Sequence, residues 1–189
     1  MANVLAELKL HHISRVAVHC AAVLSMFPAL GVASCAPKFA ETDYTPYRGE
    51  GAAMLEGQAY VELRMGRYGD INFRPCVGAP VFLAPATAFN AYSLSNVGGS
   101  ALDARAGRAA PYWRKSICDS QGRFTFSGVP AGNWIVATRV ALGTSVPTRN
   151  RGQISTEMLA QNVTLRPGQN AVVMMTTVVG CVYDPEPPC

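Results

Sequence analysis

Histidine is nearly absent from this sequence of 189 residues: the three that occur, His11, His12 and His19, all lie before residue 35. Charged side chains are scarce as well, at 15% of the chain against about 25% in an average soluble domain. Beyond residue 34 there is no imidazole for Ser-His-Asp or Cys-His catalysis, for a His-ligated zinc ion or for general base chemistry. The commonest routes to an enzyme are therefore closed in the greater part of the chain.

The beginning of the chain has the layout of an export signal. Residues 1–15 carry two basic side chains and one acid, and residues 16–34 are apolar without a formal charge, an order typical of secretory signals. The run ends in Val-Ala-Ser followed by Cys35, which is similar to the bacterial lipobox. We predict a lipoprotein signal peptide over 1–34, with lipid on Cys35 attaching the protein to a membrane. An uncleaved anchor, disfavoured by Pro28, and ordinary signal cleavage are the alternatives.

The cysteines beyond the lipobox are even in number, and they are Cys76, Cys118, Cys181 and Cys189. Four cysteines allow three pairings. We expect Cys181 to pair with Cys189, because they bracket a short loop rich in proline, which leaves Cys76 for Cys118. No C-x-x-C spacing supports a zinc site, so we predict structural disulfides in an oxidising compartment, with no metal and no cofactor.

Residues 35–50 are predicted to be a lipidated tether. They are polar, contain two prolines and show no periodicity, so we expect them to hold the folded part away from the membrane. From residue 51 to 180 the sequence alternates between strand and turn patterns. The predicted strands are 59–65, 71–76, 79–85, 123–127, 134–139, 158–165 and 171–179. About seven strands without a long helix predict an all-β sandwich, closed by a disulfide-linked tail over 181–189.

A long insertion interrupts the strand pattern between residues 86 and 115. It is rich in Gly, Ala, Ser and Arg, and we expect a short helix only at 101–106. Long irregular connections are often functional, and aromatic and arginine side chains are enriched at interface hot spots. The candidate partner-binding residues are Tyr92, Arg105, Arg108, Tyr112, Trp113 and Arg114. In the alternative interpretation, Tyr112 and Trp113 plug the open end of the sandwich and the arginines form a solvated rim.

The segment DSQGRFTFSGVPAGNWIVAT resembles the hairpin of carboxypeptidase regulatory-like domains, which have a transthyretin-like β-sandwich. The pattern is an acid, a glycine, Phe-x-Phe, a Gly-x-Pro-x-Gly turn and an aromatic, here Asp119, Gly122, Phe124, Phe126, Gly128, Pro130, Gly132 and Trp134. The likeness covers residues 54–140 well and 152–178 loosely. It implies a single sandwich domain in a bacterial envelope lipoprotein, and a Cys76–Cys118 disulfide agrees with it. These are core and turn positions, so the resemblance specifies a fold more strongly than an activity.

No pair of carboxylates has a spacing known for acid–base catalysis; Glu62 with Asp70 and Asp103 with Asp119 are read as solvated strand and turn side chains. Residues 35–189 carry a net charge of only +3, since two of the 16 basic and one of the 12 acidic side chains lie earlier, so no nucleic-acid partner is expected.

We therefore predict a non-enzymatic protein of the bacterial cell envelope, an outer-membrane lipoprotein facing the periplasm or the cell surface. Its favoured role is as a structural or interaction module that docks to a multiprotein envelope or secretion-type assembly. The alternative is a module that binds carbohydrate or another surface polymer through Tyr92, Tyr112 and Trp113, because exposed aromatic rings are the usual sugar platform.

Overall fold

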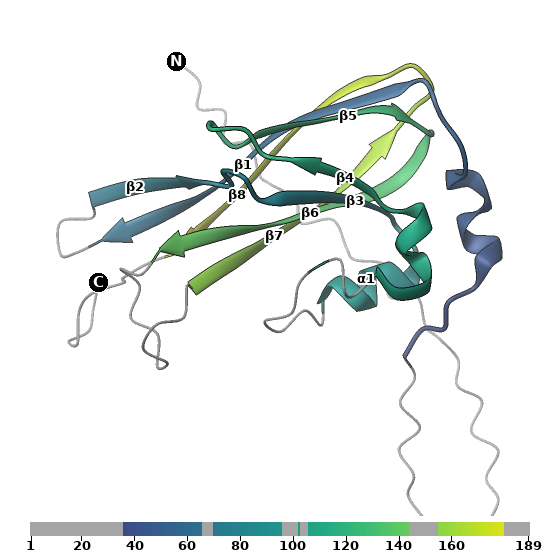
Figure 1. Cartoon of the computed structure of the whole chain (residues 1–189), viewed down its shortest axis with the longest axis horizontal. Helices are drawn as coiled ribbons and strands as arrows, with labels where there is room; N and C mark the ends of the chain where they lie inside the picture. The colour runs from purple at the N-terminus through teal and green to yellow at the C-terminus, as the bar shows by residue number, and fades with distance from the viewer. Residues whose placement is uncertain (1–35, 66–69, 96–101, 103–105, 144–154, 180–189) are drawn as a thin grey trace, which may run out of the picture. The chain divides into compact units, whose positions relative to one another are not determined.

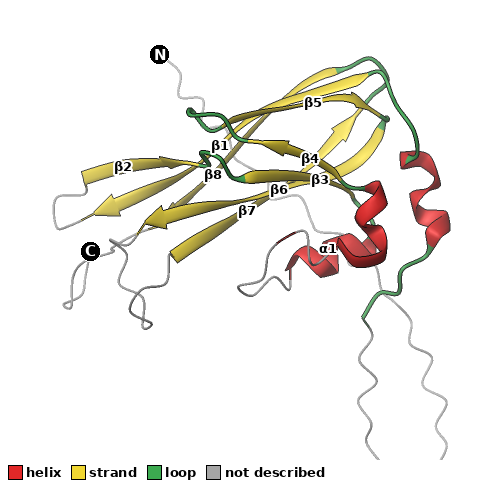
Figure 2. Cartoon of the chain, in the orientation of Figure 1, coloured by secondary structure: helices red, strands yellow, loops and turns green. Residues whose placement is uncertain are grey.

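Two four-stranded sheets pack face to face in the computed structural model (Figures 1 and 2), which describes residues 36–65, 70–95, 102, 106–143 and 155–179. The strands are β1 (Ala53–Met65), β2 (Asp70–Pro75), β3 (Pro80–Pro85), β4 (Arg114–Ile117), β5 (Arg123–Val129), β6 (Gly132–Gly143), β7 (Ser155–Leu165) and β8 (Asn170–Val179). The helical segments are the 3-10 helices η1 (Glu41–Tyr47) and η2 (Gly107–Tyr112) and the α-helix α1 (Ala88–Ser95). The predicted all-β sandwich is confirmed.

Strand β1 is the centre of the first sheet, called sheet A here. It pairs antiparallel with β5 along its first half and with β2 along its second half, and it pairs parallel with β8 on its other side. The second sheet, sheet B, is antiparallel throughout, in the order β4-β3-β6-β7. The long strands β1, β6, β7 and β8 therefore span the sandwich, and the shorter ones complete it.

The main core lies between the two sheets and follows from the period of two along each strand. In β5, Phe124 and Phe126 are buried while Arg123, Thr125 and Ser127 are exposed. The buried face predicted from Phe-x-Phe is thus confirmed, and the two rings meet edge to face with their centroids 6.0 Å apart. Side chains of β1, β3, β6, β7 and β8 complete the same cluster.

The strand count differs from the prediction at one place. β4 begins at Arg114, inside the segment predicted to be an irregular insertion, and pairs with β3 over four residues. Its sequence, RKSI, is too short and too polar to show a strand period, so only pairing with β3 makes it a strand. β1 also begins six residues earlier than predicted, at Ala53.

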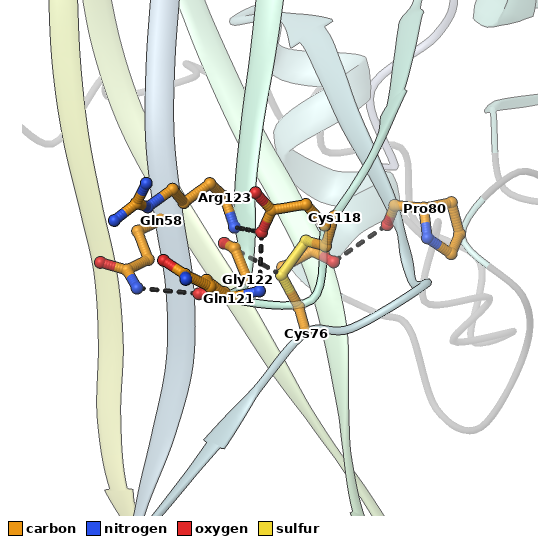
Figure 3. The surroundings of a disulfide bond; sticks show 9 residues. Gln58, Cys76, Pro80, Cys118, Gln121, Gly122 and Arg123 are labelled. Carbon is orange, nitrogen blue, oxygen red and sulfur yellow. Dashed lines mark hydrogen bonds between the residues drawn. A yellow bond between two sulfur atoms is a disulfide. The ribbon is translucent and has the colours of Figure 1, made fainter.

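The predicted disulfide between Cys76 and Cys118 is present, with 5.8 Å between the two Cα atoms. It joins the end of β2 to the turn before β5 (Figure 3). In that turn the Asp119 carboxylate accepts the backbone N–H groups of Arg123 and Gln121, each at 2.8 Å. These bonds favour the charged form and lower the pKa of Asp119.

No other residue type fits the backbone position of Gly122 in the same turn. Its φ of +73° lies in the left-handed region, and a Cβ on it would lie 2.6 Å from the backbone oxygen of Ala59. The Asp119–Gly122 turn is therefore fixed by its disulfide, its carboxylate and its glycine together. Cys35 and the predicted Cys181–Cys189 pair lie outside the described residues, as does most of the helix predicted at 101–106.

The described parts of the insertion, 86–95, 102 and 106–115, pack over the outer face of sheet B, which corrects the prediction of a largely irregular segment. Phe82, Ala84, Ile135 and Ala137 point away from the main core and, with Leu94 of α1, form a second hydrophobic cluster. The Trp113 ring packs edge to face on Phe82 at 5.9 Å. Trp113 thus covers the outer face of sheet B and does not plug an end of the sandwich. Apolar burial, which the loop-like composition concealed, accounts for this order.

Part of the segment predicted as a tether is folded too. Residues 41–47 form η1, in which Tyr44 is 0% exposed, and the Tyr47 ring meets the Trp134 ring edge to face at 4.9 Å. The gain from burying Tyr44 fully and Tyr47 in part outweighs the weak helical preference of a short sequence that has a proline near its end. The polar composition, on which the tether prediction rested, reflects only the exposed side of this helix.

Candidate functional site

Tyr44 joins η1 to the insertion. Its hydroxyl lies 3.0 Å from the Thr87 Oγ1 atom and donates to the Asn90 Oδ1 atom at 3.1 Å. Burial is the main cause that raises the pKa of Tyr44, so the phenol stays neutral at physiological pH and its proton is available for these bonds. The buried Tyr44 hydroxyl thus joins η1 to Thr87 and Asn90, which lie 43 and 46 positions further along the sequence.

Asn90 connects this contact to the rest of the site. Its side chain is fully buried, and its Nδ2 atom donates to the Pro85 carbonyl oxygen at 2.8 Å. Its Oδ1 atom accepts from the Trp113 Nε1–H group as well, at 3.2 Å. Thr87 caps the start of α1, since its Oγ1 atom accepts the Asn90 backbone N–H at 3.2 Å. A satisfied buried network of this kind fixes a single arrangement of the three segments.

Aromatic rings from the same segments pack around the network. Tyr44 stands between Phe39 and Tyr112, with centroid separations of 5.0 and 4.6 Å. Phe89 of α1 meets Phe39 edge to face at 5.7 Å. The Arg108 guanidinium lies 5.1 Å from the centroid of the Phe39 ring, a favourable cation–π distance. These contacts order the chain from residue 39 onward.

Between η1 and η2 the surface is hollowed to a volume of about 280 Å³. We call this the Arg–aromatic hollow, and its lining is Tyr47, Arg48, Gly49, Pro111, Tyr112, Trp113 and Arg114. The segments on its two sides are more than 60 residues apart in sequence. The tyrosine and asparagine network beneath it explains why they meet here.

Two arginines flank the hollow from opposite sides. Arg48 donates through Nη2 to the Tyr112 hydroxyl at 3.1 Å and forms an ion pair with Glu41, and Arg114 donates through Nη2 to the Gly49 carbonyl oxygen at 2.6 Å. The hydrogen bond to Tyr112 is the main cause that raises the pKa of Arg48. A guanidinium has five N–H donors in a planar fork, so one or two bonds leave each arginine able to take a carboxylate.

This arrangement suits recognition of an anionic group more than chemistry on one. No nucleophile next to a base lies in the hollow, since its lining is tyrosine, arginine, glycine, proline and tryptophan. Among the described residues, no group of three His, Cys, Asp or Glu side chains is close enough to hold a metal ion. The chemistry on offer is two guanidinium groups beside aromatic rings, which is the composition of an interface hot spot.

Three predicted partner-binding residues, Tyr112, Trp113 and Arg114, meet in the hollow. Arg108 lies beside it on Phe39. Tyr92 is elsewhere, on α1, with 43% of its surface exposed, and Arg105 lies outside the described residues.

Sequence reasoning missed Tyr44, Tyr47, Arg48 and Asn90. The first three fall in the segment interpreted as a tether, and Asn90 falls in the insertion. The signal available was the pair of tyrosines three positions apart around a proline, because such spacing places two rings on one side of a tight helix. Asn90 had no signal, since a buried amide is recognisable only from the partners that satisfy it.

Comparisons with known proteins show the fold of the chain. No family model and no curated protein matches the sequence. A solved structure of a candidate carbohydrate-binding protein from Pseudomonas aeruginosa is similar with a TM-score of 0.55 and 23% identity, over 75% of this chain and 99% of that one. This likeness supports the β-sandwich architecture and no more than that.

Two pilins give weaker structural matches. The minor pilin of Streptococcus agalactiae has a TM-score of 0.34 and 14% identity, over 74% of this chain and 49% of that one. The major pilin subunit of Bacillus cereus has a TM-score of 0.30 and 14% identity, over 65% and 30% of the two chains. The carboxypeptidase regulatory-like family stays a prediction from the sequence pattern.

Proposed function

We propose that this chain is a non-enzymatic, lipid-anchored protein of the bacterial envelope that docks to a protein partner through the Arg–aromatic hollow. The observation that supports the proposal is the hollow itself, in which Arg48 and Arg114 flank Tyr112 on a support of buried hydrogen bonds. Arginine fits a carboxylate with two parallel N–H···O bonds. The partner group we expect is an acidic side chain or a chain-terminal carboxylate.

The rigidity of the site favours docking over a loose electrostatic encounter. Tyr44, Asn90 and Trp113 hold both sides of the hollow in place before any partner arrives. A surface that is already ordered loses less conformational entropy on binding, so more of the contact energy becomes affinity. The sugar platform predicted at Tyr112 and Trp113 gains less support, because both rings are already packed on Tyr44 and Phe82.

The predicted lipid at Cys35 would place this surface close to a membrane. Phe39 packs on Tyr44 and beneath Arg108, and four residue steps separate it from Cys35. At about 3.5 Å per residue these steps span at most about 14 Å. Among the described residues no helix is long and apolar enough to cross a membrane. Because a lipid on Cys35 would hold Phe39 within about 14 Å of a membrane, the partner we propose presents its acidic group near the membrane surface.

The anchor and the docking are tested on protein purified from membranes in mild detergent. We expect the intact mass to be that of a chain beginning at Cys35 with a diacylglyceryl adduct, and we expect a partner protein to co-purify. Cys35→Ser is expected to lose the adduct and to be released or to accumulate unprocessed. An intact wild-type mass without lipid would contradict the anchor, whatever the result for docking.

Replacing Arg48 and Arg114 together by Ala tests the docking surface. One hot-spot arginine contributes about 2 kcal/mol, or about 30-fold in affinity, so we expect most of the co-purifying partner to be lost. Arg123→Ala is the matched control, because Arg123 is exposed on β5, pairs with Gln58 in sheet A and does not line the hollow. Equal partner recovery from both variants, with melting temperatures unchanged, would contradict the proposed surface.

A further inference from the structure

The outer face of sheet A, away from the insertion, has aromatic side chains where β1 and β2 pair. Tyr60 of β1 lies opposite Pro75, and Glu62 lies opposite Phe73 of β2. Outward-facing positions in a solvated sheet are usually polar, yet Phe73 is 57% exposed and Ile71 is 53% exposed. An exposed phenylalanine beside a second ring is a feature that core packing does not explain.

Beside these rings the surface is hollowed to about 250 Å³, with a lining of Gln58, Tyr60, Phe73, Pro75 and Gln121. We call this the Tyr60–Phe73 hollow. The two rings meet edge to face, with centroids 5.6 Å apart and an interplanar angle of 77°. No lining residue carries a charge. The hollow therefore combines a fixed aromatic surface with two amide side chains.

The polar side of this hollow is rigid. The Gln58 Nε2 atom donates to the Gln121 backbone oxygen at 2.8 Å, which leaves its Oε1 atom as an acceptor. Gln121 lies in the Asp119–Gly122 turn, which the Cys76–Cys118 disulfide and the Asp119 carboxylate hold in place (Figure 3). A binding site works best when its polar groups are held by such supporting contacts.

We infer that the Tyr60–Phe73 hollow binds a neutral sugar, as one pyranose ring of an oligosaccharide or polysaccharide. The C–H face of a pyranose carries partial positive charge and packs on the electron-rich face of an aromatic ring. Its hydroxyl groups both donate and accept, which matches the amides of Gln58 and Gln121. The volume lies just under the roughly 300 Å³ at which pockets for drug-sized ligands begin, which is room for one ring whose neighbours along the polymer lie in solvent.

The lining itself carries no charge, which favours a neutral ligand; Glu62, opposite Phe73, and Arg123, opposite Gln58, are neighbours of the hollow without lining it. An acidic sugar or a phosphate needs a cationic partner, and the arginine of β2 at position 74 is not among the lining residues. A protein partner is less suited to the hollow, because its lining offers two rings and two amides in about 250 Å³ and no arginine of the kind that dominates protein interfaces. Neutral pyranoses satisfy the rings and the amides together.

Binding is tested by titrating the purified protein with three neutral hexasaccharides: the β-1,4-linked oligomers of glucose and of N-acetylglucosamine and the α-1,4-linked oligomer of glucose. Isothermal calorimetry is expected to show saturable binding of at least one of them, with a Kd of about 1 mM or tighter. Phe73→Ala is expected to weaken that binding by about tenfold or more through loss of the stacking surface. Phe73→Tyr is expected to keep it.

Ile71→Ala is the matched control. Ile71 lies on the same strand and faces the same side, is exposed to a similar degree and is not part of the hollow. We expect this variant to bind as the wild type does. The inference is overturned if none of the three sugars binds, if Phe73→Ala binds like the wild type, or if Ile71→Ala loses as much.

The site is independent of the proposed docking surface. It lies on sheet A, whereas the Arg–aromatic hollow lies beside the segments that cover sheet B. We expect the Arg48 and Arg114 double variant to bind sugar normally, and Phe73→Ala to retain the co-purifying partner. A double arginine variant that keeps its partner would contradict the docking assignment alone, and a Phe73→Ala variant that keeps sugar binding would contradict the sugar assignment alone.

Discussion

Phe126→Ala is expected to lower the free energy of unfolding by about 3–5 kcal/mol, the usual cost of removing a buried phenylalanine ring. Phe126 is 4% exposed, faces the core between the sheets and meets the Phe124 ring edge to face. Its loss leaves a cavity that the neighbouring strands fill only in part, because each is held by pairing on sheet A. Urea denaturation followed by circular dichroism measures the change.

Thr125→Ala serves as the control for that substitution. Thr125 directly precedes Phe126 on β5 and is exposed, so its side chain makes no contribution to the core and we expect a change within about 0.5 kcal/mol. If Phe126→Ala were as mild as Thr125→Ala, the face carrying Phe124 and Phe126 would not be the core, and the arrangement of the two sheets would be wrong.

Replacing both Cys76 and Cys118 by Ala is expected to lower the free energy of unfolding by about 4 kcal/mol. The disulfide links positions separated by 42 residues in sequence, and closing a loop of that length in the unfolded chain removes entropy of about this size. Alanine is the better replacement, because both cysteines are buried and a serine hydroxyl would need a partner there. Thermal and urea unfolding measure the loss.

Reduction of the wild-type protein provides an independent comparison. In a strong reductant the melting temperature should fall toward that of the double alanine variant, and the variant itself should not respond. A double variant as stable as the oxidised wild type would contradict the structural role of this disulfide. If the melting temperature of the wild type did not change in reductant, this would contradict a stabilising Cys76–Cys118 disulfide that the reductant can reach as the protein unfolds.

The strands were predictable from alternating apolar and polar side chains wherever one face of a sheet is buried and the other is exposed to solvent. The sequence RFTFSGV shows the period of two without ambiguity, and the glycine and acid before it mark the turn. The Cys76–Cys118 pairing was predictable because four cysteines remain beyond the lipobox and two of them, Cys181 and Cys189, bracket a short loop. In both cases the decisive information lies within a short stretch of sequence or in a small count.

The Arg–aromatic hollow was only half predictable. Tyr112, Trp113 and Arg114 stand out by composition, but their counterparts Tyr47 and Arg48 come from a segment whose polar composition indicates a tether. Those two sides meet because Tyr44 is buried against Asn90, a contact between residues 46 positions apart. Local patterns carry no information on such pairings, since tertiary packing overrides weak local preference.

The Tyr60–Phe73 hollow could not be predicted from the sequence, for a different reason. The alternation in β1 and β2 predicts that Tyr60 and Phe73 share a sheet face with polar residues, but it does not give the register that sets Tyr60 opposite Pro75. The pairing of β1 with β5 brings in Gln121, from the turn before β5, and so assembles the amide side of the hollow. Three segments must be placed before the site exists.

The central claim, that the Arg–aromatic hollow contacts a protein partner, is tested most directly by photo-crosslinking in intact cells. A photoreactive benzoylphenylalanine is placed at Pro111, which is exposed in the hollow lining, or at Thr125, which is exposed on β5 of sheet A. We expect a discrete crosslinked adduct from position 111, its loss when Arg48 and Arg114 are also changed to Ala, and no adduct from position 125. Adducts from position 125 but none from position 111 would contradict the claim.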